Sequence, residues 1–156
     1  MTTSSVSERL AALGIQLPPA DAPRGMYRPA VRSGSQIWLA GQGPTRGNEL
    51  VYTGRIGAEL DVEQGQAAAR LCMINLLAQL QRACDGDLSR VVRCLSATVY
   101  VASAPGFFHQ PRVADGATSL LAELWGQENL PARSAVGMFV LPMNIAVEID
   151  AVFEVR

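Results

Sequence analysis

Residues 131–155, "PARSAVGMFVLPMNIAVEIDAVFEV", decide the fold class, because they combine two strand-like patterns with a turn-like stretch between them. Apolar and polar side chains alternate after Ala146, which is typical of a half-buried strand. The proline and asparagine of "LPMN", residues 141–144, are frequent turn residues. We therefore predict a β-hairpin whose arms are residues 133–140 and 145–156.

This hairpin predicts which side chains share a face. If Val140 and Ile145 flank the turn, Gly137 lies opposite Glu148, and alternation puts Arg133 on the same face as Glu148. The predicted polar face consists of Arg133, Ala135, Gly137, Glu148 and Asp150. The predicted core face consists of Val136, Met138, Ile149, Ala151, Phe153 and Val155.

The predicted polar face has two interpretations. Its small residues leave room for a ligand, and a guanidinium group binds a carboxylate through two parallel hydrogen bonds. Arg133 and Glu148 would then line a site for a small carboxylic acid from opposite ends. Alternatively, both charges lie on a solvated face or pair across a subunit contact.

The rest of the chain predicts helices that are long enough to cover one face of a sheet. Helices are expected at residues 5–14, capped by Ser5, at 61–86, capped by Asp61, and at 111–125. Residues 15–29 are expected to be irregular, residues 30–44 to form a hairpin, and residues 91–103 to form a strand. The order predicts one α+β domain over residues 1–156, with a mixed sheet, two main helices on one face and a short N-terminal helix.

Composition excludes several classes of function. All thirteen basic residues are arginine, so neither a Schiff-base lysine nor a P-loop lysine is present. The net charge of −1 and the scattered arginines predict no nucleic-acid partner and no membrane partner. Three cysteines without CxxC spacing, and no signal-like N-terminus, predict packed, reduced thiols in a cytoplasmic protein. With His109 as the sole histidine, we predict no metal site.

Four motifs carry a resemblance to a known family: "PARSAVG" with the "LP.N.AVEI.A.FEV" pattern after it, "GMY" at 25–27, "LAGQGP" at 39–44 and "SAPGF" at 103–107. Together they resemble the YjgF/RidA family of enamine/imine deaminases, in its chorismate-mutase-like branch. The resemblance implies a chorismate-mutase-like fold and a homotrimer with sites in the clefts between subunits. It also implies hydrolysis of amino-acid-derived enamines and imines to 2-oxo acids and ammonia, without metal or cofactor.

The resemblance assigns roles by position. Arg133 matches the arginine that clamps the substrate carboxylate, and Glu148 matches the glutamate associated with the hydrolytic water. Tyr27 matches the pocket tyrosine, and Gly41 and Gln42 match the "GQ" pair that lines the site.

Three expected site positions depart from the family pattern. Ala40 replaces a frequent serine, and Ala135 replaces a frequent cysteine. Asp115 stands where an asparagine contributed by the next subunit is common, and its charge would repel an anionic substrate unless it is protonated or paired.

Three functions remain open at this point. The first is a deaminase of small 2-imino or enamine acids, and the second is a dedicated pathway deaminase with a larger, aminomuconate-like substrate. The third is a non-catalytic trimer that binds a carboxylate metabolite. Arg24, Arg28 and Arg32 are interpreted as solvated charges rather than a basic rim, and His109 as a loop or capping residue.

Overall fold

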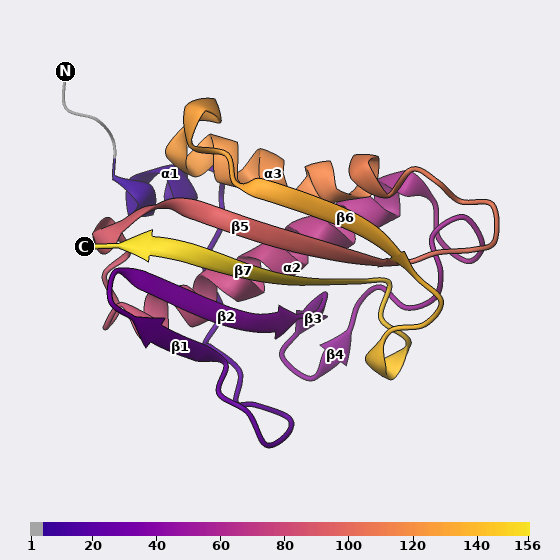
Figure 1. Cartoon of the computed structure of the whole chain (residues 1–156), viewed down its shortest axis with the longest axis horizontal. Coiled ribbons are helices and arrows are strands. Elements are labelled where there is room, and N and C mark those ends of the chain that lie inside the picture. Colours follow the sequence, from indigo (N-terminus) through magenta and orange to yellow (C-terminus); the bar gives the residue numbers. More distant parts are fainter. Residues whose placement is uncertain (1–4) are drawn as a thin grey trace.

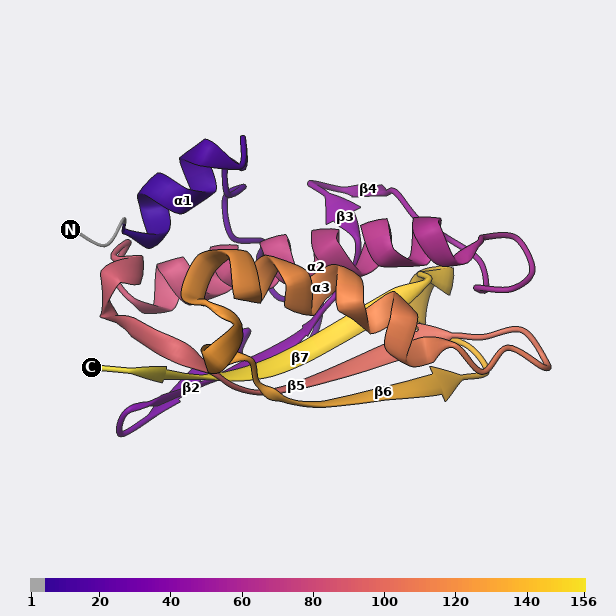
Figure 2. The same ribbon diagram turned by 90° about the horizontal axis from the view of Figure 1, so that it is seen from above.

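The molecule is a five-stranded sheet covered on one face by helices. The structure, a computed structural model, describes residues 5–156. The sheet has the strand order β1-β2-β7-β5-β6. Its strands are β1 (Ala30–Ser33), β2 (Gln36–Gln42), β5 (Val91–Ala102), β6 (Ala132–Met138) and β7 (Val147–Val155). Two short strands, β3 (Thr45–Arg46) and β4 (Glu49–Leu50), pair separately from this sheet. Figure 1 shows β6 and β1 at the two edges, and Figure 2 shows α2 and α3 on the same side of the sheet.

The helices begin where the sequence places capping residues. Helix α1 (Val6–Ala12) starts with a capping box formed by Ser5 and Glu8, and α2 (Val62–Ala83) starts with one formed by Asp61 and Gln64. Helix α3 (Gln110–Trp125) has proline in its first turn, where the missing N–H has no helical partner to lose. Three short 3-10 helices, at Leu88–Arg90, Gln127–Asn129 and Pro142–Asn144, connect the larger elements. The predicted positions of all three α-helices are confirmed.

The core lies between the sheet and the two long helices. Along β7, buried residues alternate with partly exposed ones from Val147 to Val155, so one face of this strand packs inward. Helices α2 and α3 approach closely at Gly116, where a Cβ would collide with the backbone carbonyl of Gln66. No helix within residues 5–156 combines the length and apolarity needed to cross a bilayer. The predicted α+β class, with a mixed sheet and two main helices on one face, is confirmed.

The predicted C-terminal hairpin is wrong. Strands β6 and β7 follow each other in sequence, but β5 lies between them, parallel to β6 and antiparallel to β7. The stretch from β5 through α3 to β6 is a β-α-β crossover, which returns the chain parallel to β5 on its free edge. Residues 141–144 therefore carry the chain across the end of β5, with Met143 and Asn144 both at positive φ.

The intervening strand also reverses the predicted faces of β6, whereas the predicted core residues of β7 are buried: Ile149, Ala151, Phe153 and Val155. Gly137 and Val147 both align with Val101, so Gly137 shares its register with Val147 rather than with Glu148. A shift of one residue turns every side chain to the opposite face of a sheet. Arg133, Ala135 and Gly137 consequently face the helices, whereas Glu148 and Asp150 lie on the open face. Val136 and Met138, predicted to be core, are 39% and 36% exposed.

Candidate functional site

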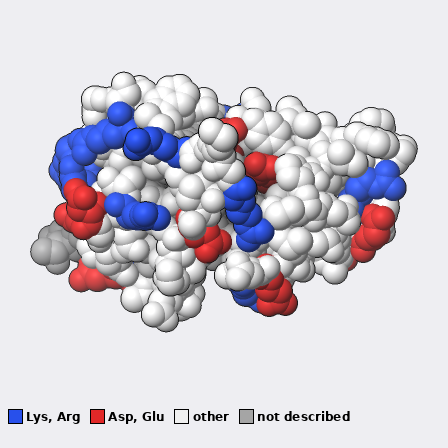
Figure 3. Space-filling view, turned by 90° about the horizontal axis from the view of Figure 1, so that it is seen from below, with Lys and Arg blue, Asp and Glu red and all other residues white. Residues whose placement is uncertain are grey.

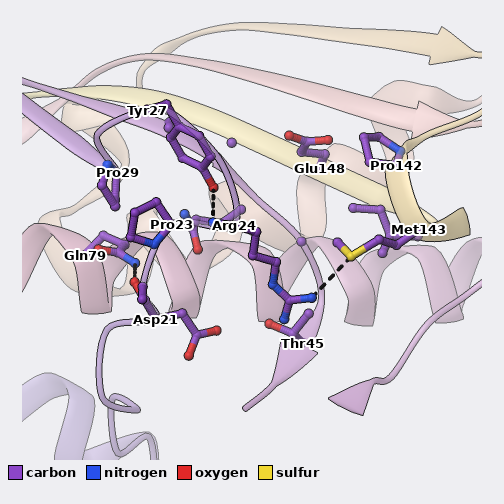
Figure 4. A pocket seen from close by; sticks show the side chains of 16 residues that line it. Asp21, Pro23, Arg24, Tyr27, Pro29, Thr45, Gln79, Pro142, Met143 and Glu148 are labelled. Atoms are coloured by element: carbon purple, nitrogen blue, oxygen red, sulfur yellow. Dashed lines mark hydrogen bonds between the residues drawn. The ribbon is translucent and has the colours of Figure 1, made fainter. Parts of the chain in front are cut away.

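A cavity of about 440 Å³ lies at the edge of the sheet formed by β1 and β2. The irregular segment before β1, the end of β2, helix α2 and the turn before β7 supply its walls. Five of the eight predicted site residues line it: Tyr27, Ala40, Gly41, Gln42 and Glu148. Figure 4 shows how the larger side chains of this Glu148 cavity are arranged.

A β-bulge shapes the floor of the Glu148 cavity. The pairing between β2 and β7 shifts between Leu39 and Gln42, so that Ala40 and Gly41 fall in the irregular part of the ladder. Bulges re-aim side chains and expose backbone near binding sites. Gly41 leaves room for the Glu148 carboxylate, which rests directly against the glycine, where an added Cβ would displace it. The bulge and the glycine together allow the carboxylate to lie over main chain.

The surroundings of Glu148 raise the pKa of its carboxyl above the ordinary value. Burial raises the pKa of the Glu148 carboxyl, and the negative charge of Asp150 raises it further. Asp150 accepts a hydrogen bond from the Tyr100 hydroxyl at 2.7 Å, and this bond raises the pKa of Tyr100. Within residues 5–156, no hydrogen bond or ion pair engages the Glu148 carboxylate, which leaves its oxygens open to a ligand or to water.

Tyr27 belongs to a segment that hydrogen bonds attach to α2 and to β2. The Tyr27 hydroxyl accepts a hydrogen bond from the Arg24 backbone N–H at 3.4 Å, and Gln79 of α2 donates to the Asp21 carbonyl at 2.8 Å. The Ala40 N–H donates to the Pro29 carbonyl at 2.9 Å. These three bonds explain how a segment without regular structure presents Tyr27, which is 47% exposed, beside the bulge.

The remaining three predicted site residues lie outside this cavity. Arg133 is on β6 at the opposite edge of the sheet and donates to the Asp115 carboxylate at 2.7 Å and to the Thr118 hydroxyl at 3.0 Å. It also donates to the Pro111 carbonyl at 3.4 Å. The Arg133 side chain is 22% exposed and that of Asp115 is 62% exposed. We call Arg133, Asp115 and Thr118 the Arg133 cluster.

The Arg133 cluster brings Asp115 to Arg133 within one chain, because α3 packs beside β6. The expectation that Asp115 is supplied to the site of a neighbouring subunit stays a prediction. Ala135 is half-buried on the same face as Arg133 and does not line the Glu148 cavity. One chain thus carries two separate groups of predicted site residues, one at each edge of its sheet.

Arg24 is exposed, as the sequence interpretation expected, but it also borders the cavity. Arg24 lines the Glu148 cavity and extends across it towards Met143 (Figure 4). Arg28 and Arg32 instead line a neighbouring surface hollow. No periodicity in residues 15–29 could have indicated this difference, because the segment has no regular structure. Only the path of this segment over α2 decides which arginine lines the Glu148 cavity.

The other candidate residues have structural positions. His109 is the N-cap residue of α3 and contacts the Phe107 ring edge-on, at 5.9 Å between ring centroids. Cys72, Cys84 and Cys94 are free and buried, as predicted, and burial raises the pKa of Cys94 to about 12. Across residues 5–156, no group of three His, Cys, Asp or Glu side chains is placed to hold a metal ion. Seen from the β1 side, basic side chains gather at one end of this face with acidic groups beside them, and most of the remaining surface is uncharged (Figure 3).

Comparison with known proteins agrees with this architecture. Residues 7–154 match the family described as "YjgF/chorismate mutase-like, putative endoribonuclease". Protein TCP17 of Trypanosoma cruzi is 42% identical over 157 residues, which cover 100% of this chain and 98% of that protein. The crystal structure of Atu1372 from Agrobacterium tumefaciens has a TM-score of 0.90 and 40% identity, and the match covers 97% of this chain and 92% of that one.

A more distantly similar solved structure contains a bound ligand. E. coli TdcF, whose crystal structure holds bound serine, has a TM-score of 0.60 and 26% identity, with 90% of this chain and 94% of that chain covered. The family match spans nearly the whole chain, and the expected chorismate-mutase-like fold is confirmed. This protein therefore belongs to the YjgF/RidA family.

Proposed function

We propose that this protein hydrolyses 2-imino and enamine acids to 2-oxo acids and ammonia, at sites shared between the subunits of a homotrimer. The observation that carries the proposal is the separation of the two half-sites. The Arg133 cluster and the Glu148 cavity lie at opposite edges of one sheet, so neither is a complete site within one chain. In a closed ring, the Arg133 edge of one subunit meets the cavity edge of the next, which completes each site.

The Arg133 cluster supplies the binding part of the proposed site. Hydrogen bonds from Arg133 to Asp115, Thr118 and the Pro111 carbonyl fix the guanidinium at the edge of the molecule. A fixed guanidinium can take a carboxylate through the N–H groups that remain free, which orients the imine carbon. Serine bound to E. coli TdcF has a carboxylate of the same kind, which supports a ligand of this class.

The Glu148 cavity supplies the proton chemistry. Glu148 accepts a proton from a water molecule whose oxygen attacks the C=N carbon, and this proton passes to the nitrogen to give a carbinolamine. The hydroxyl proton of the carbinolamine then moves through Glu148 to the nitrogen as the C–N bond breaks, leaving a 2-oxo acid and ammonia. The raised pKa of Glu148 suits both steps, since a carboxyl that titrates nearer neutral pH both accepts and returns protons. An enamine enters the same route after tautomerising to the imine.

The two alternatives to a general deaminase each have one supporting observation. Ala40 and Ala135 offer no hydroxyl or thiol to a ligand, which favours a non-catalytic trimer that binds a carboxylate. The cavity of about 440 Å³ far exceeds a three-carbon imino acid, which favours a dedicated deaminase with a larger substrate. A ribonuclease role has less support, because the net charge is −1 and His109 caps a helix.

Imine hydrolysis tests the proposal directly. 2-Iminopropionate is generated in situ, and the surviving imine is trapped with semicarbazide in the presence of wild type, Arg133→Ala or Arg70→Ala. Arg70 is the matched control, because it forms an ion pair with Glu123 on the outer helices, away from both half-sites. We expect wild type and Arg70→Ala to suppress trapping and Arg133→Ala to lose this effect.

The outcomes separate the three functions. If all three proteins suppress trapping equally, Arg133 is not the carboxylate clamp. If none suppresses trapping, general deamination of small imines is rejected, and the assay is repeated with a larger dianionic imine. Failure with both substrates, combined with Arg133-dependent binding of carboxylates, would establish the binding protein instead.

A further inference from the structure

Arg24 is a cation without an acidic partner, directed into the Glu148 cavity. Its guanidinium contacts the Met143 sulfur at 3.2 Å, which is a weak interaction compared with a carboxylate. Among the described residues 5–156, four other arginines form ion pairs, whereas Arg24 forms none. Asp21 also lines the cavity, but the ion pairs of the described chain do not include one between Asp21 and Arg24.

Hydrogen bonds of the surrounding segment hold the backbone of Arg24 beside the cavity. Its backbone N–H donates to the Tyr27 hydroxyl, and the segment that precedes it is held to α2 by Gln79. The side chain then extends between Tyr27 and Thr45 and ends near Met143, so that it spans the cavity below Glu148 (Figure 4). A guanidinium held in this way loses less conformational freedom on binding an anion than a freely moving surface arginine does.

We propose that Arg24 binds a second anionic group of the substrate, so that the preferred substrates are 2-imino dicarboxylic acids. This inference rests on the proposed function: Arg133 of one subunit takes the carboxylate next to the imine, and Arg24 takes the carboxylate at the far end. The cavity of about 440 Å³ has room for the longer molecule. The class of reaction that supplies such a substrate is the two-electron oxidation of an acidic amino acid by a flavin or nicotinamide oxidant, or the elimination of water from a 3-hydroxy acidic amino acid.

The experiment compares two ligands of equal chain length that differ in one carboxylate. Binding of succinate and butyrate is measured by calorimetry for wild type, Arg24→Gln and Arg28→Gln. Arg28 is the control, because it carries the same charge in the same segment but lines the neighbouring hollow rather than the cavity. We expect wild type to bind succinate about tenfold more tightly than butyrate, which is the gain that one charge-assisted contact provides.

Arg24→Gln should remove this preference and leave butyrate binding unchanged, whereas Arg28→Gln should keep the preference. Equal binding of the two ligands by wild type would overturn the inference. So would an equal loss of succinate affinity in both variants, because a general charge effect would then explain it.

The same measurements separate this inference from the proposed function. Hydrolysis of 2-iminopropionate that depends on Arg133 supports the deaminase proposal. If succinate then binds no more tightly than butyrate, or binds more tightly without depending on Arg24, the second anion site is rejected. If the succinate preference depends on Arg24 but neither 2-iminopropionate nor 2-iminosuccinate is hydrolysed, the anion site stands and the deaminase is rejected.

Discussion

Arg133 donates a hydrogen bond to the Asp115 carboxylate at 2.7 Å, so the residue expected to bind substrate already has an acidic partner in its own chain. The Asp115 side chain is 62% exposed, and the pair is therefore partly solvated. Ion pairs at such positions contribute little and are readily exchanged for another anion. In the proposed site, the substrate carboxylate takes the N–H groups that Asp115 leaves free, and the negative charge of Asp115 weakens this binding without abolishing it.

Replacing Asp115 with asparagine should strengthen carboxylate binding. Asp115→Asn keeps a hydrogen-bond acceptor for Arg133 but removes the charge that repels an incoming anion. We expect the affinity for a monocarboxylate to rise by up to about fivefold, since an exposed ion pair contributes at most ~1 kcal/mol. Calorimetric titration with butyrate measures the change. Glu123→Gln, which breaks the Arg70 ion pair on the same helix, is the control and should leave this affinity unchanged. Weaker binding by Asp115→Asn would mean that the aspartate positions Arg133 rather than competing for it.

Gly41→Ala should damage activity far more than stability. The added methyl group would collide with the end of the Glu148 side chain, which is flexible and can move away at low cost. The fold should therefore persist, while the carboxylate leaves its position over the bulge. A misplacement of ~1 Å can lower a rate by roughly 100-fold, so we expect a loss of that order in imine hydrolysis. Thermal unfolding checks the fold, and Gly25→Ala, where a Cβ would have no contact closer than 3.5 Å, is the control. Full activity in Gly41→Ala would exclude the proposed role of the Glu148 position.

The elements of this fold were predictable from sequence wherever their signals are local. The capping boxes at Ser5 and Asp61 and the proline in the first turn of α3 each involve residues within one turn of helix. Strand neighbours depend on distant parts of the chain. Nothing between residues 133 and 156 indicates that β5 separates β6 from β7, and "LPMN" also suits a tight hairpin. This single wrong pairing moved Arg133 onto the face of Glu148.

For the site residues too, local sequence signals were informative and long-range strand pairing was not predictable. Four residues that the positional match to the family had grouped line one cavity beside the β-bulge: Tyr27, Gly41, Gln42 and Glu148. Geometry argued from the sequence could not place Arg133, since its face depends on the register through β5. Arg24 was missed for a related reason: an irregular segment gives no pattern from which the direction of a side chain could be inferred.

Glu148→Gln should stabilise the fold at neutral pH. Burial raises the pKa of the folded Glu148 carboxyl above its usual value of 4.5, so the folded state favours the protonated form. Stability from this group is fully present below the usual pKa and is lost as the pH rises through the raised pKa. The uncharged glutamine avoids that loss. Urea unfolding at pH 7.5 should therefore show a higher midpoint for the variant, and the difference should vanish in acid, below the usual pKa.

The control for this prediction is Glu154→Gln on the same strand, where the carboxylate forms an ion pair with Arg93 at 2.9 Å. Removing that charge should leave the midpoint unchanged or lower it slightly. A destabilised Glu148→Gln protein at neutral pH would show instead that the carboxylate is stabilised by contacts in the assembled protein.

Mixing two inactive variants tests whether the site is shared between subunits. Arg133→Ala lacks the clamp but keeps the Glu148 cavity, and Glu148→Gln lacks the proton acceptor but keeps the Arg133 cluster. If a site takes one half from each of two subunits, trimers co-assembled from equal amounts of both variants have about one in four sites intact. Activity should recover to roughly a quarter of wild type after joint refolding, and not when the separately assembled variants are combined. An Arg133→Ala/Glu148→Gln double variant, refolded with inactive Arg133→Ala, is the control, since no pairing of these two chains restores a complete site. Absence of recovery from co-assembled single variants would place both residues in one chain's site, against their positions on opposite faces of the sheet.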